Sequence, residues 1–191
     1  MLKEQNKIRC TWVGQNPLMI KYHDTEWGVP LHNDRKLFEF FVLDTFQAGL
    51  SWEIILKKRE GFKNAFKNFN IRQVASFNGQ EIEKLLRNEN IIRNRMKVEA
   101  TVNNAKKFLE IKKEFGSFDK YIWQFTKYDV IKNSYKKDSQ IPPFIAQSEI
   151  MSKDLKNRGF KFVGPIICYA FMQGIGMVND HLVTCFCYNK L

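Results

Sequence analysis

The segment from Gly159 to Pro165 limits the possible folds of this chain more than any other part of the sequence. Gly159 follows a polar helical run over 148–158 and can adopt the left-handed conformation that ends a helix, whereas Pro165 suits a first helical position. The residues between them, FKFVG, predict a short hairpin with a glycine at its tip. Such a hairpin lets the backbone approach a ligand closely, and the amides that open the second helix favour a phosphate. An ordinary packing corner between two helices has the same pattern, and the hairpin alone favours that simpler interpretation.

The composition predicts one domain, spanning 1–191, that binds a polyanion. With 44% apolar residues and 17 Phe, the 191-residue chain can build a substantial core. Its 31 basic and 20 acidic residues give a net charge of +11, which is typical of proteins that bind nucleic acid or an acidic membrane surface. No helix combines a broad apolar face with an aromatic-edged basic face, so a membrane partner is disfavoured. Each short basic group, such as the one at 57–59, can equally be a solvated helix face.

The N-terminal residues 1–9 are polar and lack the apolar core of a signal peptide, and no stretch is long enough to span a bilayer. We therefore expect a cytoplasmic location. In that reducing compartment cysteines are expected to be buried thiols or metal ligands, in preference to disulfides. The chain has four of them: Cys10, Cys168, Cys185 and Cys187.

Helical periodicity recurs through most of the chain and predicts an all-α fold. Asn33 or Asp34 can cap one helix and Ser51 a second, with a break at 48–50 between them. Apolar spacing predicts further helices over 81–87, 96–113 and 118–125. The segment 127–147 contains two adjacent prolines and predicts an irregular connection.

Nitrogen and sulfur donors occur in pairs at the two ends of the chain. His181 and Cys185 are four residues apart, which predicts that they share one face of a helical turn, and Cys10 and His23 lie far away near the N-terminus. Four such ligands complete a tetrahedral zinc site of the structural kind, which would join the two ends of the chain. The alternative is a set of buried thiols and core histidines. Cys187 is a competing ligand.

Large aromatic residues and one carboxylate predict a second candidate site in the N-terminal third. Aromatic faces can sandwich a flat base, although core packing is the more common role of such residues. Asp44 lies in the apolar stretch 38–52, and a buried unpaired carboxylate is costly enough to indicate function. The alternative is a surface-facing Asp on an amphipathic helix. The aromatic residues are Trp12, Tyr22, Trp27, Phe46 and Trp52.

Four long motifs carry a family resemblance. They read RCTWVGQNPLMIKYHDTEWGVP at 9–30, QAGLSW at 47–52, LKKRE at 56–60 and RGFKFVGPIICYAFMQGIGMVNDH at 158–181. Together they resemble the constitutive, type I bacterial 3-methyladenine DNA glycosylases, from about Cys10 to Cys185. The resemblance implies a divergent helix-hairpin-helix glycosylase fold, with the helix-hairpin-helix at 148–176, and excision of N3-methylated adenine from DNA.

The resemblance also implies roles for individual residues. It implies one structural zinc, bound by Cys10, His23, His181 and Cys185, that links the terminal segments 9–30 and 178–188. Tyr22 and Trp52 would flank the extruded base, with Trp12 in the pocket wall. Gly49 and Leu50 would press into the gap left in the duplex, and Lys161 and Gly164 would lie in the hairpin that holds phosphate.

Two positions depart from the family pattern, and both bear on the choice of base. Asp44 stands where the family usually has a glutamate that reads the edge of the base, and it is shorter by about 1.5 Å. Phe46 replaces a glutamine, and we expect it to bind substrate together with Tyr22, Trp52 and Trp12. Either change can alter base preference.

The resemblance further implies a reaction without strand cleavage. Related enzymes carry a catalytic Asp where this chain has Asn179, and lyase-active relatives carry a lysine after the hairpin glycine, where this chain has Pro165. Alkylation at N3 leaves adenine cationic and a good leaving group, so flipping and holding the base is most of the catalytic task. The resemblance implies that Asp44, which would read the edge of the base, is the catalytic residue.

The sequence therefore predicts a monofunctional glycosylase that acts on double-stranded alkylated DNA as a monomer and requires no protein partner. The alternative from another class is a zinc-containing DNA-binding or lesion-sensing protein whose Asp44 and Phe46 have closed the pocket. A glycosylase for another damaged base is a third possibility.

Overall fold

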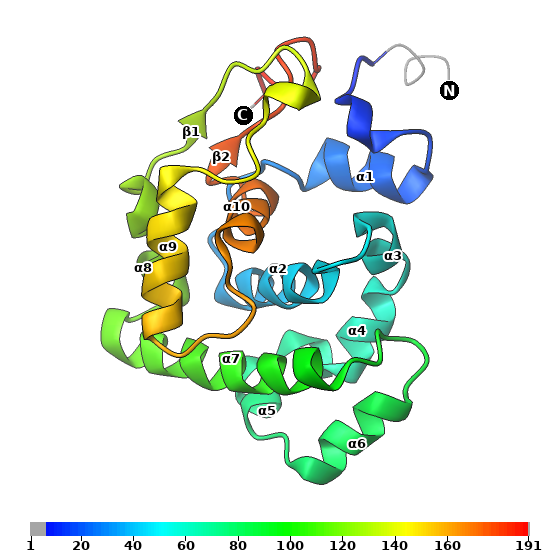
Figure 1. The fold of residues 1–191 in the computed structure, drawn as a ribbon, viewed down its shortest axis with the longest axis vertical. Helices are drawn as coiled ribbons and strands as arrows, with labels where there is room; N and C mark the ends of the chain where they lie inside the picture. The colour runs from blue at the N-terminus through cyan, green and yellow to red at the C-terminus, as the bar shows by residue number, and fades with distance from the viewer. Residues whose placement is uncertain (1–6, 191) are drawn as a thin grey trace.

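The structure, a computed structural model, describes residues 7–190, so part of the expected leaderless N-terminus, residues 1–6, lies outside the described residues. The described part is predominantly helical (Figure 1). Its α-helices are α1 (Pro17–Thr25), α2 (Asp34–Gln47), α3 (Trp52–Lys57), α4 (Arg59–Ala65), α5 (Ile71–Ala75), α6 (Gly79–Arg87), α7 (Arg95–Phe115), α8 (Phe118–Trp123), α9 (Ala146–Asn157) and α10 (Pro165–Gly174). Short 3₁₀ turns are η1 (Thr11–Val13), η2 (Lys67–Phe69), η3 (Gln124–Thr126) and η4 (Asp138–Gln140).

Helix boundaries follow the capping residues of the sequence. The Asn33 side chain accepts a hydrogen bond from the amide of Lys36 and begins α2, and Ser51 accepts one from Ile54 and begins α3. Between them Ala48 leaves the helical conformation and Gly49 takes φ +79°, so the predicted break is confirmed. The helices predicted over 81–87, 96–113 and 118–125 are confirmed as α6, α7 and the pair α8 and η3.

The segment between α9 and α10 ends and restarts the helix as predicted. Gly159 takes φ +84°, and Pro165 is the first residue of α10. The glycine expected at the hairpin tip plays a different part, because Gly164 is the extended N-cap of α10 and Phe162 takes the left-handed conformation instead, with φ +57°. No atom lies within 4 Å of the place where a Gly164 Cβ would stand, so this backbone is open to approach.

The all-α prediction needs one correction. The two-residue strands β1 (Ile131–Lys132) and β2 (Val178–Asn179) pair in parallel, with Ile131 opposite Val178. Strands this short show no alternation of apolar and polar residues, so the sequence contains no signal for them. The rest of the 127–147 connection is mostly irregular, as predicted, apart from η4.

Helix α2 lies at the centre of the core. All residues from Leu37 to Phe46 are buried, and α2 contacts α3, α7, α8 and α10. Figure 1 shows α2 above the long α7, with α8 and α9 standing at one side and α1 and α3 at the other. A helix buried on every face must also bury its polar residues, and α2 carries Asp44.

The two ends of the described chain meet on one side of the molecule (Figure 1). The amide of Phe186 donates to the carbonyl of Ile8, and the amides of Gly28 and Leu31 donate to the carbonyls of Gln173 and Ile175. The bonds of Gly28 and Leu31 hold the N-terminal segment against the end of α10, and the bond of Phe186 joins it to the C-terminal segment. None of the helices in the described range is long and apolar enough to cross a membrane.

Gly176 sits at the tightest point of this junction and generates a stability prediction. A Cβ on Gly176 would lie 2.4 Å from the backbone nitrogen of Pro30, and its φ is +74°. We expect Gly176→Ala to lower the free energy of unfolding by about 2–4 kcal/mol, because the backbone of Pro30 must shift and alanine is strained at this φ.

The matched control is Gly79→Ala, at the first position of α6, where no atom lies within 4 Å of the new Cβ. Alanine there should leave stability unchanged or raise it by up to about 1 kcal/mol. Chemical denaturation of both variants makes the comparison, and equally small effects would contradict the close packing at residue 176.

Candidate active site

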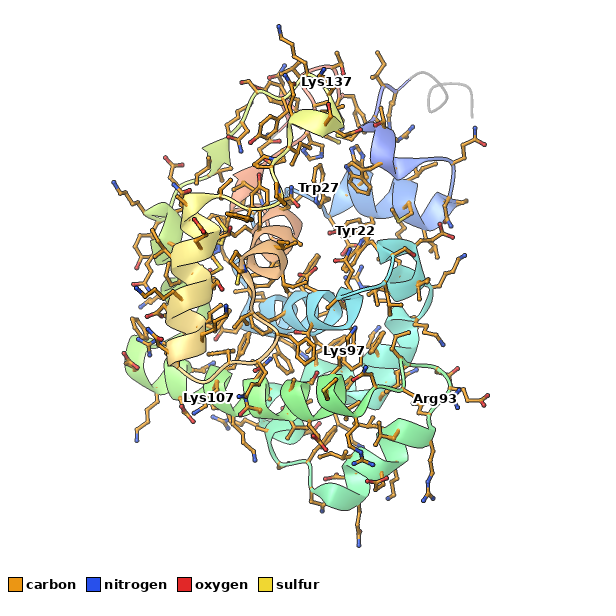
Figure 2. The ribbon with its side chains drawn as sticks, viewed as in Figure 1. Tyr22, Trp27, Arg93, Lys97, Lys107 and Lys137 are labelled. Carbon is orange, nitrogen blue, oxygen red and sulfur yellow. The ribbon has the colours of Figure 1, made fainter. Side chains whose placement is uncertain are left out.

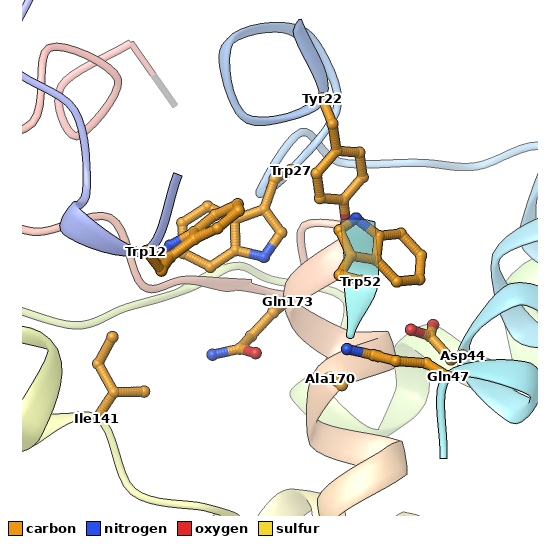
Figure 3. Close-up of a pocket in the computed structure, with 9 residues that line it drawn as sticks. All are labelled: Trp12, Tyr22, Trp27, Asp44, Gln47, Trp52, Ile141, Ala170 and Gln173. Carbon is orange, nitrogen blue, oxygen red and sulfur yellow. The ribbon is translucent and has the colours of Figure 1, made fainter. Parts of the chain in front are cut away.

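A pocket of about 190 Å³ opens between α1, α2, α3 and α10 (Figure 3). Sites for drug-sized ligands occupy about 300–1,000 Å³, so this pocket suits a single flat ring system and not a whole nucleotide. Its lining residues are Trp12, Tyr22, Trp27, Asp44, Gln47, Trp52, Ile141, Ala170 and Gln173.

Tyr22, Trp52 and Trp12, which the sequence proposed for one pocket, line it together. The ring centroids of Tyr22 and Trp52 are 5.1 Å apart at an interplanar angle of 53°, and Trp12 makes an edge contact with Trp27 at 4.9 Å. A base inserted between two parallel rings needs about 7 Å between their planes. Tyr22 and Trp52 therefore contact each other in this structure, and sandwiching a base requires them to move apart.

Asp44 supplies the carboxylate of the pocket. Its side chain projects from α2 and the residue is only 4% exposed, which excludes the surface-facing alternative. The Oδ2 atom has no hydrogen-bond partner, and burial raises the pKa of this carboxyl well above its ordinary value of 3.8. Burial and the Asp44 charge also raise the pKa of the Tyr22 hydroxyl. The pocket thus contains a carboxyl oxygen that no protein group pairs, which makes it available to a ligand.

Phe46 does not line the pocket, and its assignment to the substrate-binding residues is corrected. The residue is fully buried, and its ring packs against Phe62 at 4.6 Å and Phe66 at 6.0 Å. Residues two apart on a helix point in different directions, so Asp44 and Phe46 cannot share the pocket wall.

Gln47 is the polar pocket residue of α2 that the sequence analysis missed, although its spacing of three from Asp44 on a helix was a usable signal. Gln173 and Ala170 come from α10 and are likewise three apart. Ile141 comes from the irregular connection, for which the sequence offered no signal. Trp27 was named in the aromatic cluster, but not as a site residue.

The turn between α2 and α3 carries Gly49 and Leu50 at the edge of the site. Leu50 is 37% exposed, and the Gly49 Cβ position is open. Lys97 of α7 fixes this turn, because its Nζ donates to the carbonyls of Phe46 at 2.8 Å and Ala48 at 2.5 Å (Figure 2). A cation at the carboxyl end of a helix also interacts favourably with the helix dipole.

The hairpin that carries Lys161 and Gly164 is fixed by the same helix. Asn104 accepts a hydrogen bond from the amide of Lys161 and donates one to its carbonyl, at 2.8 and 3.0 Å. Asn103 donates to the carbonyl of Gly159. The Lys161 side chain is exposed, so it is free to reach toward an anion while its backbone is held.

Some basic residues that contribute to the net charge have structural partners. Arg59, in the basic group at 57–59, donates to both carboxylate oxygens of Glu26 and to Glu39 at 2.7–2.8 Å. Because Arg59 and Lys97 are both engaged within the protein, the net charge of the sequence overstates the number of cations available to a partner.

A second cluster joins the two ends of the chain. The ligand atoms of His23, His181, Cys185 and Cys187 lie within 4.8 Å of one another, and all four residues are buried. The helical turn predicted for 181–185 is wrong, since these residues form irregular turns, yet the fold brings His181 and Cys185 together.

The cluster has the orientation of a metal site. His181 Nδ1 faces Asn179 Oδ1 at 3.0 Å, and His23 Nδ1 faces Asp24 at 2.8 Å, so Nε2 of each ring is available as a ligand. His181 Nε2 is buried without a partner, and burial lowers the pKa of this ring to about 4, which keeps it neutral.

Two further thiols adjoin Cys185. Cys10 hydrogen-bonds to Cys185, which lowers the pKa of the Cys185 thiol well below its ordinary value, and the amide of Leu182 donates to Cys10 Sγ at 3.4 Å. The amide of Cys187 donates to Cys185 Sγ at 3.4 Å, while burial raises the pKa of the Cys187 thiol to about 12. The group whose ligand atoms lie within 4.8 Å of one another contains Cys187 and not the predicted Cys10, whereas Cys10 hydrogen-bonds to Cys185, so the two thiols compete for the fourth position.

Position 179, where related enzymes carry a catalytic Asp, is an asparagine here and does not line the pocket. Asn179 is fully buried, and its side-chain oxygen hydrogen-bonds to His181 Nδ1. The neighbouring Asp180 lies behind the pocket wall, where it accepts hydrogen bonds from Tyr169 and Gln173. Among the described residues, Asp44 is the acidic residue that lines the pocket.

Comparison with known proteins identifies the family. The profile described as "Methyladenine glycosylase" matches residues 12–188. This chain belongs to the methyladenine glycosylase family. It is 44% identical to "DNA-3-methyladenine glycosylase 1" of Escherichia coli K12 over 94% of this chain and 96% of that protein, and 43% identical to the Haemophilus influenzae DNA-3-methyladenine glycosylase over 94% and 97%.

Solved structures of methyladenine glycosylases have the same fold. A crystal structure of 3-methyladenine DNA glycosylase I superposes with a TM-score of 0.92 at 44% identity and covers 94% of this chain and 99% of that one. The Staphylococcus aureus enzyme, solved to show its recognition of 3-methyladenine, gives 0.90 at 36% identity and covers 93% of this chain and 95% of that one.

The unpaired Asp44 predicts that this methyladenine glycosylase is less stable than a variant without the charge. A carboxyl whose pKa is raised by folding stabilises the protein below its unfolded pKa of about 4, and that stabilisation is lost as the pH rises through the folded value. Asp44→Asn should therefore raise the free energy of unfolding at neutral pH by about 1 kcal/mol, or about 2–4 °C in Tm.

The difference between Asp44→Asn and the wild-type protein should vanish below about pH 4. Thermal unfolding of both proteins between acidic and neutral pH measures it. An Asn variant that is less stable than the wild type at neutral pH would show that Asp44 has a stabilising partner.

Proposed function

We propose that this protein is a DNA-3-methyladenine glycosylase, which hydrolyses the N-glycosidic bond between 3-methyladenine and deoxyribose in alkylated double-stranded DNA. The observation that carries the proposal is the unpartnered Asp44 carboxyl in a base-sized aromatic pocket. The similar proteins support the proposal, because they are named for this activity and match this chain over almost their whole length.

The positive charge of the methylated base matches the carboxylate and the aromatic rings of the pocket. Methylation at N3 gives the base a positive charge, which weakens its bond to the sugar and attracts both a carboxylate and aromatic faces. Asp44 would accept a hydrogen bond from the base and ionise as the cation enters. Neutral adenine supplies no such charge, so it gains less from burial beside Asp44 than 3-methyladenine does.

The hydrolysis itself requires little from the protein. The base leaves with the electrons of the glycosidic bond and becomes neutral, and water adds to the sugar carbon and loses a proton. Removing the base from the duplex costs a few kcal/mol, and stacking in the pocket offsets this. The reaction ends without strand cleavage, since no lysine is among the residues that line the pocket.

Two exposed loops are proposed to hold the DNA. The α9–α10 segment acts as the helix-hairpin-helix, with the open backbone at Gly164 and the exposed Lys161 near a phosphate. Leu50 and Gly49 press into the gap that the flipped base leaves, because the turn is exposed and fixed by Lys97. A cytoplasmic, monomeric protein that needs no partner stays a prediction of the sequence.

One structural zinc is proposed at the junction of the two chain ends. The His and Cys donor set is typical of a closed zinc site, and the buried Nε2 of His181 fits it because that atom has no other partner. We assign the fourth ligand to Cys10, which, like Cys185, accepts a backbone N–H bond at its sulfur. The metal would hold the pocket wall formed by the N-terminal segment and would take no part in the reaction.

The lesion-sensing alternative requires a closed pocket. Phe46 instead packs in the core and does not fill the pocket, which keeps a volume of about 190 Å³ beside Asp44. No feature of the described residues favours that alternative.

Release of free base tests the activity. We expect the purified protein to release 3-methyladenine from methylated duplex DNA, detected by mass spectrometry, without breaking the strand. Asp44→Ala should reduce the rate by about 100-fold or more, because the charged base loses its partner, while binding to undamaged duplex changes little. No release by folded protein would exclude the activity, and an equal loss of excision and DNA binding would make Asp44 a structural residue.

Metal analysis tests the zinc site. Elemental analysis of the purified wild-type protein should find one zinc per chain. Cys10→Ser should lose most of the metal and stability, whereas Cys187→Ser should keep both, since Cys10 is the proposed ligand. The opposite result for the two variants would transfer the fourth position to Cys187, and full stability in a metal-free protein would remove the structural role.

A further inference from the structure

The side-chain amide of Gln173, on α10, lines the pocket, and a hydrogen bond to Asp180 fixes its orientation. Gln173 Nε2 donates to Asp180 Oδ2 at 2.8 Å. A carboxylate only accepts hydrogen bonds, so the nitrogen must face Asp180 and the oxygen must face the other way. Figure 3 shows that oxygen on the side of the amide toward Gln47 and Asp44. The pocket therefore has a hydrogen-bond acceptor at a set position.

Asp180 is held in place by two other donors. Its Oδ2 also accepts from the Tyr169 hydroxyl at 2.5 Å, and its Oδ1 accepts from Asn133 Nδ2 at 2.7 Å. The residue is only 1% exposed. If the Gln173 amide turned over, its oxygen would face this carboxylate and a buried hydrogen bond would be lost. The amide oxygen is therefore held toward the pocket.

The acceptor that Gln173 presents selects for a hydrogen-bond donor opposite it, and the pocket also contains one unpaired donor, Trp52 Nε1. Asp44 Oδ2 is an acceptor without a partner, and Gln173 Oε1 is a second acceptor. Adenine carries an amino group, a donor, at the ring position where guanine carries a carbonyl oxygen, an acceptor. A guanine lesion would place that oxygen opposite Gln173 Oε1, where it gains no hydrogen bond.

We propose that Gln173 is a specificity-determining residue whose Oε1 accepts a hydrogen bond from the exocyclic amino group of the flipped base, and so favours alkylated adenine over alkylated guanine. This inference rests on the proposed function. Asp180 is its positioning residue, since it touches the Gln173 amide and not the base.

Duplex DNA treated with dimethyl sulfate provides both lesions for the test. Release of 3-methyladenine and 3-methylguanine is followed by mass spectrometry for the wild-type protein and for Gln173→Met, which has a similar length but no amide. We expect kcat/KM for 3-methyladenine to fall by about 10- to 100-fold and that for 3-methylguanine to stay level or rise. Gln173→Ala removes the amide without placing any new side chain in the pocket, and it should shift the ratio in the same direction.

Binding of free bases gives a second readout. Trp12, Trp27 and Trp52 line the pocket, so their fluorescence reports occupancy. The wild-type protein should prefer 3-methyladenine to 3-methylhypoxanthine, in which a carbonyl replaces the amino group, and Gln173→Met should lose about 10-fold or more of this preference.

Tyr169→Phe is the matched control, because it removes another donor to Asp180 Oδ2 and leaves the pocket amide intact. It should lower stability and leave the preference for adenine unchanged. Equal losses for both lesions in the Gln173 variants, unchanged ratios, or the same ratio shift in Tyr169→Phe would each overturn the inference. Absence of any release by the wild-type protein would instead overturn the proposed function, and the inference with it.

Discussion

The pocket depends on the contact between the two ends of the chain. Trp12, Tyr22 and Trp27 form one wall and belong to the N-terminal segment, which is held against the end of α10 by backbone hydrogen bonds and by the His and Cys cluster. Gly176 permits this contact because a larger residue would meet the backbone of Pro30. Without the junction, the aromatic wall would have no opposing acid, since Asp44 comes from a different helix.

Helix α7 provides the second constraint. Its Lys97 binds the backbone of the α2–α3 turn, and its Asn104 binds the backbone of the hairpin after α9. Both bind main-chain groups, so the two loops keep their conformation while their exposed side chains remain free. One rigid helix of 21 residues thus fixes the spacing between the two loops proposed to hold DNA.

The raised pKa of the Asp44 carboxyl comes from the position of α2. Because this helix is buried on every face, Asp44 is removed from water without a partner, which is unfavourable for folding and favourable for receiving a cation. Gln173 shows the complementary arrangement, with one end of its amide satisfied by Asp180 and the other directed into the pocket. The pocket therefore combines the unpaired carboxyl oxygen of Asp44 and the oriented acceptor of Gln173 with one unpaired donor, Trp52 Nε1.

The sequence by itself determined the helices around the site, because Asn33, Ser51, Gly159 and Pro165 act through local backbone chemistry. Its long motifs also determined the family, and the family resemblance placed Trp12, Tyr22, Asp44 and Trp52 in the pocket. Only the tertiary structure placed Phe46 in the core, brought Gln173 and Ile141 to the pocket, and paired the two short strands. These outcomes depend on which face of each helix meets another element and on contacts between residues distant in sequence, which no local pattern encodes.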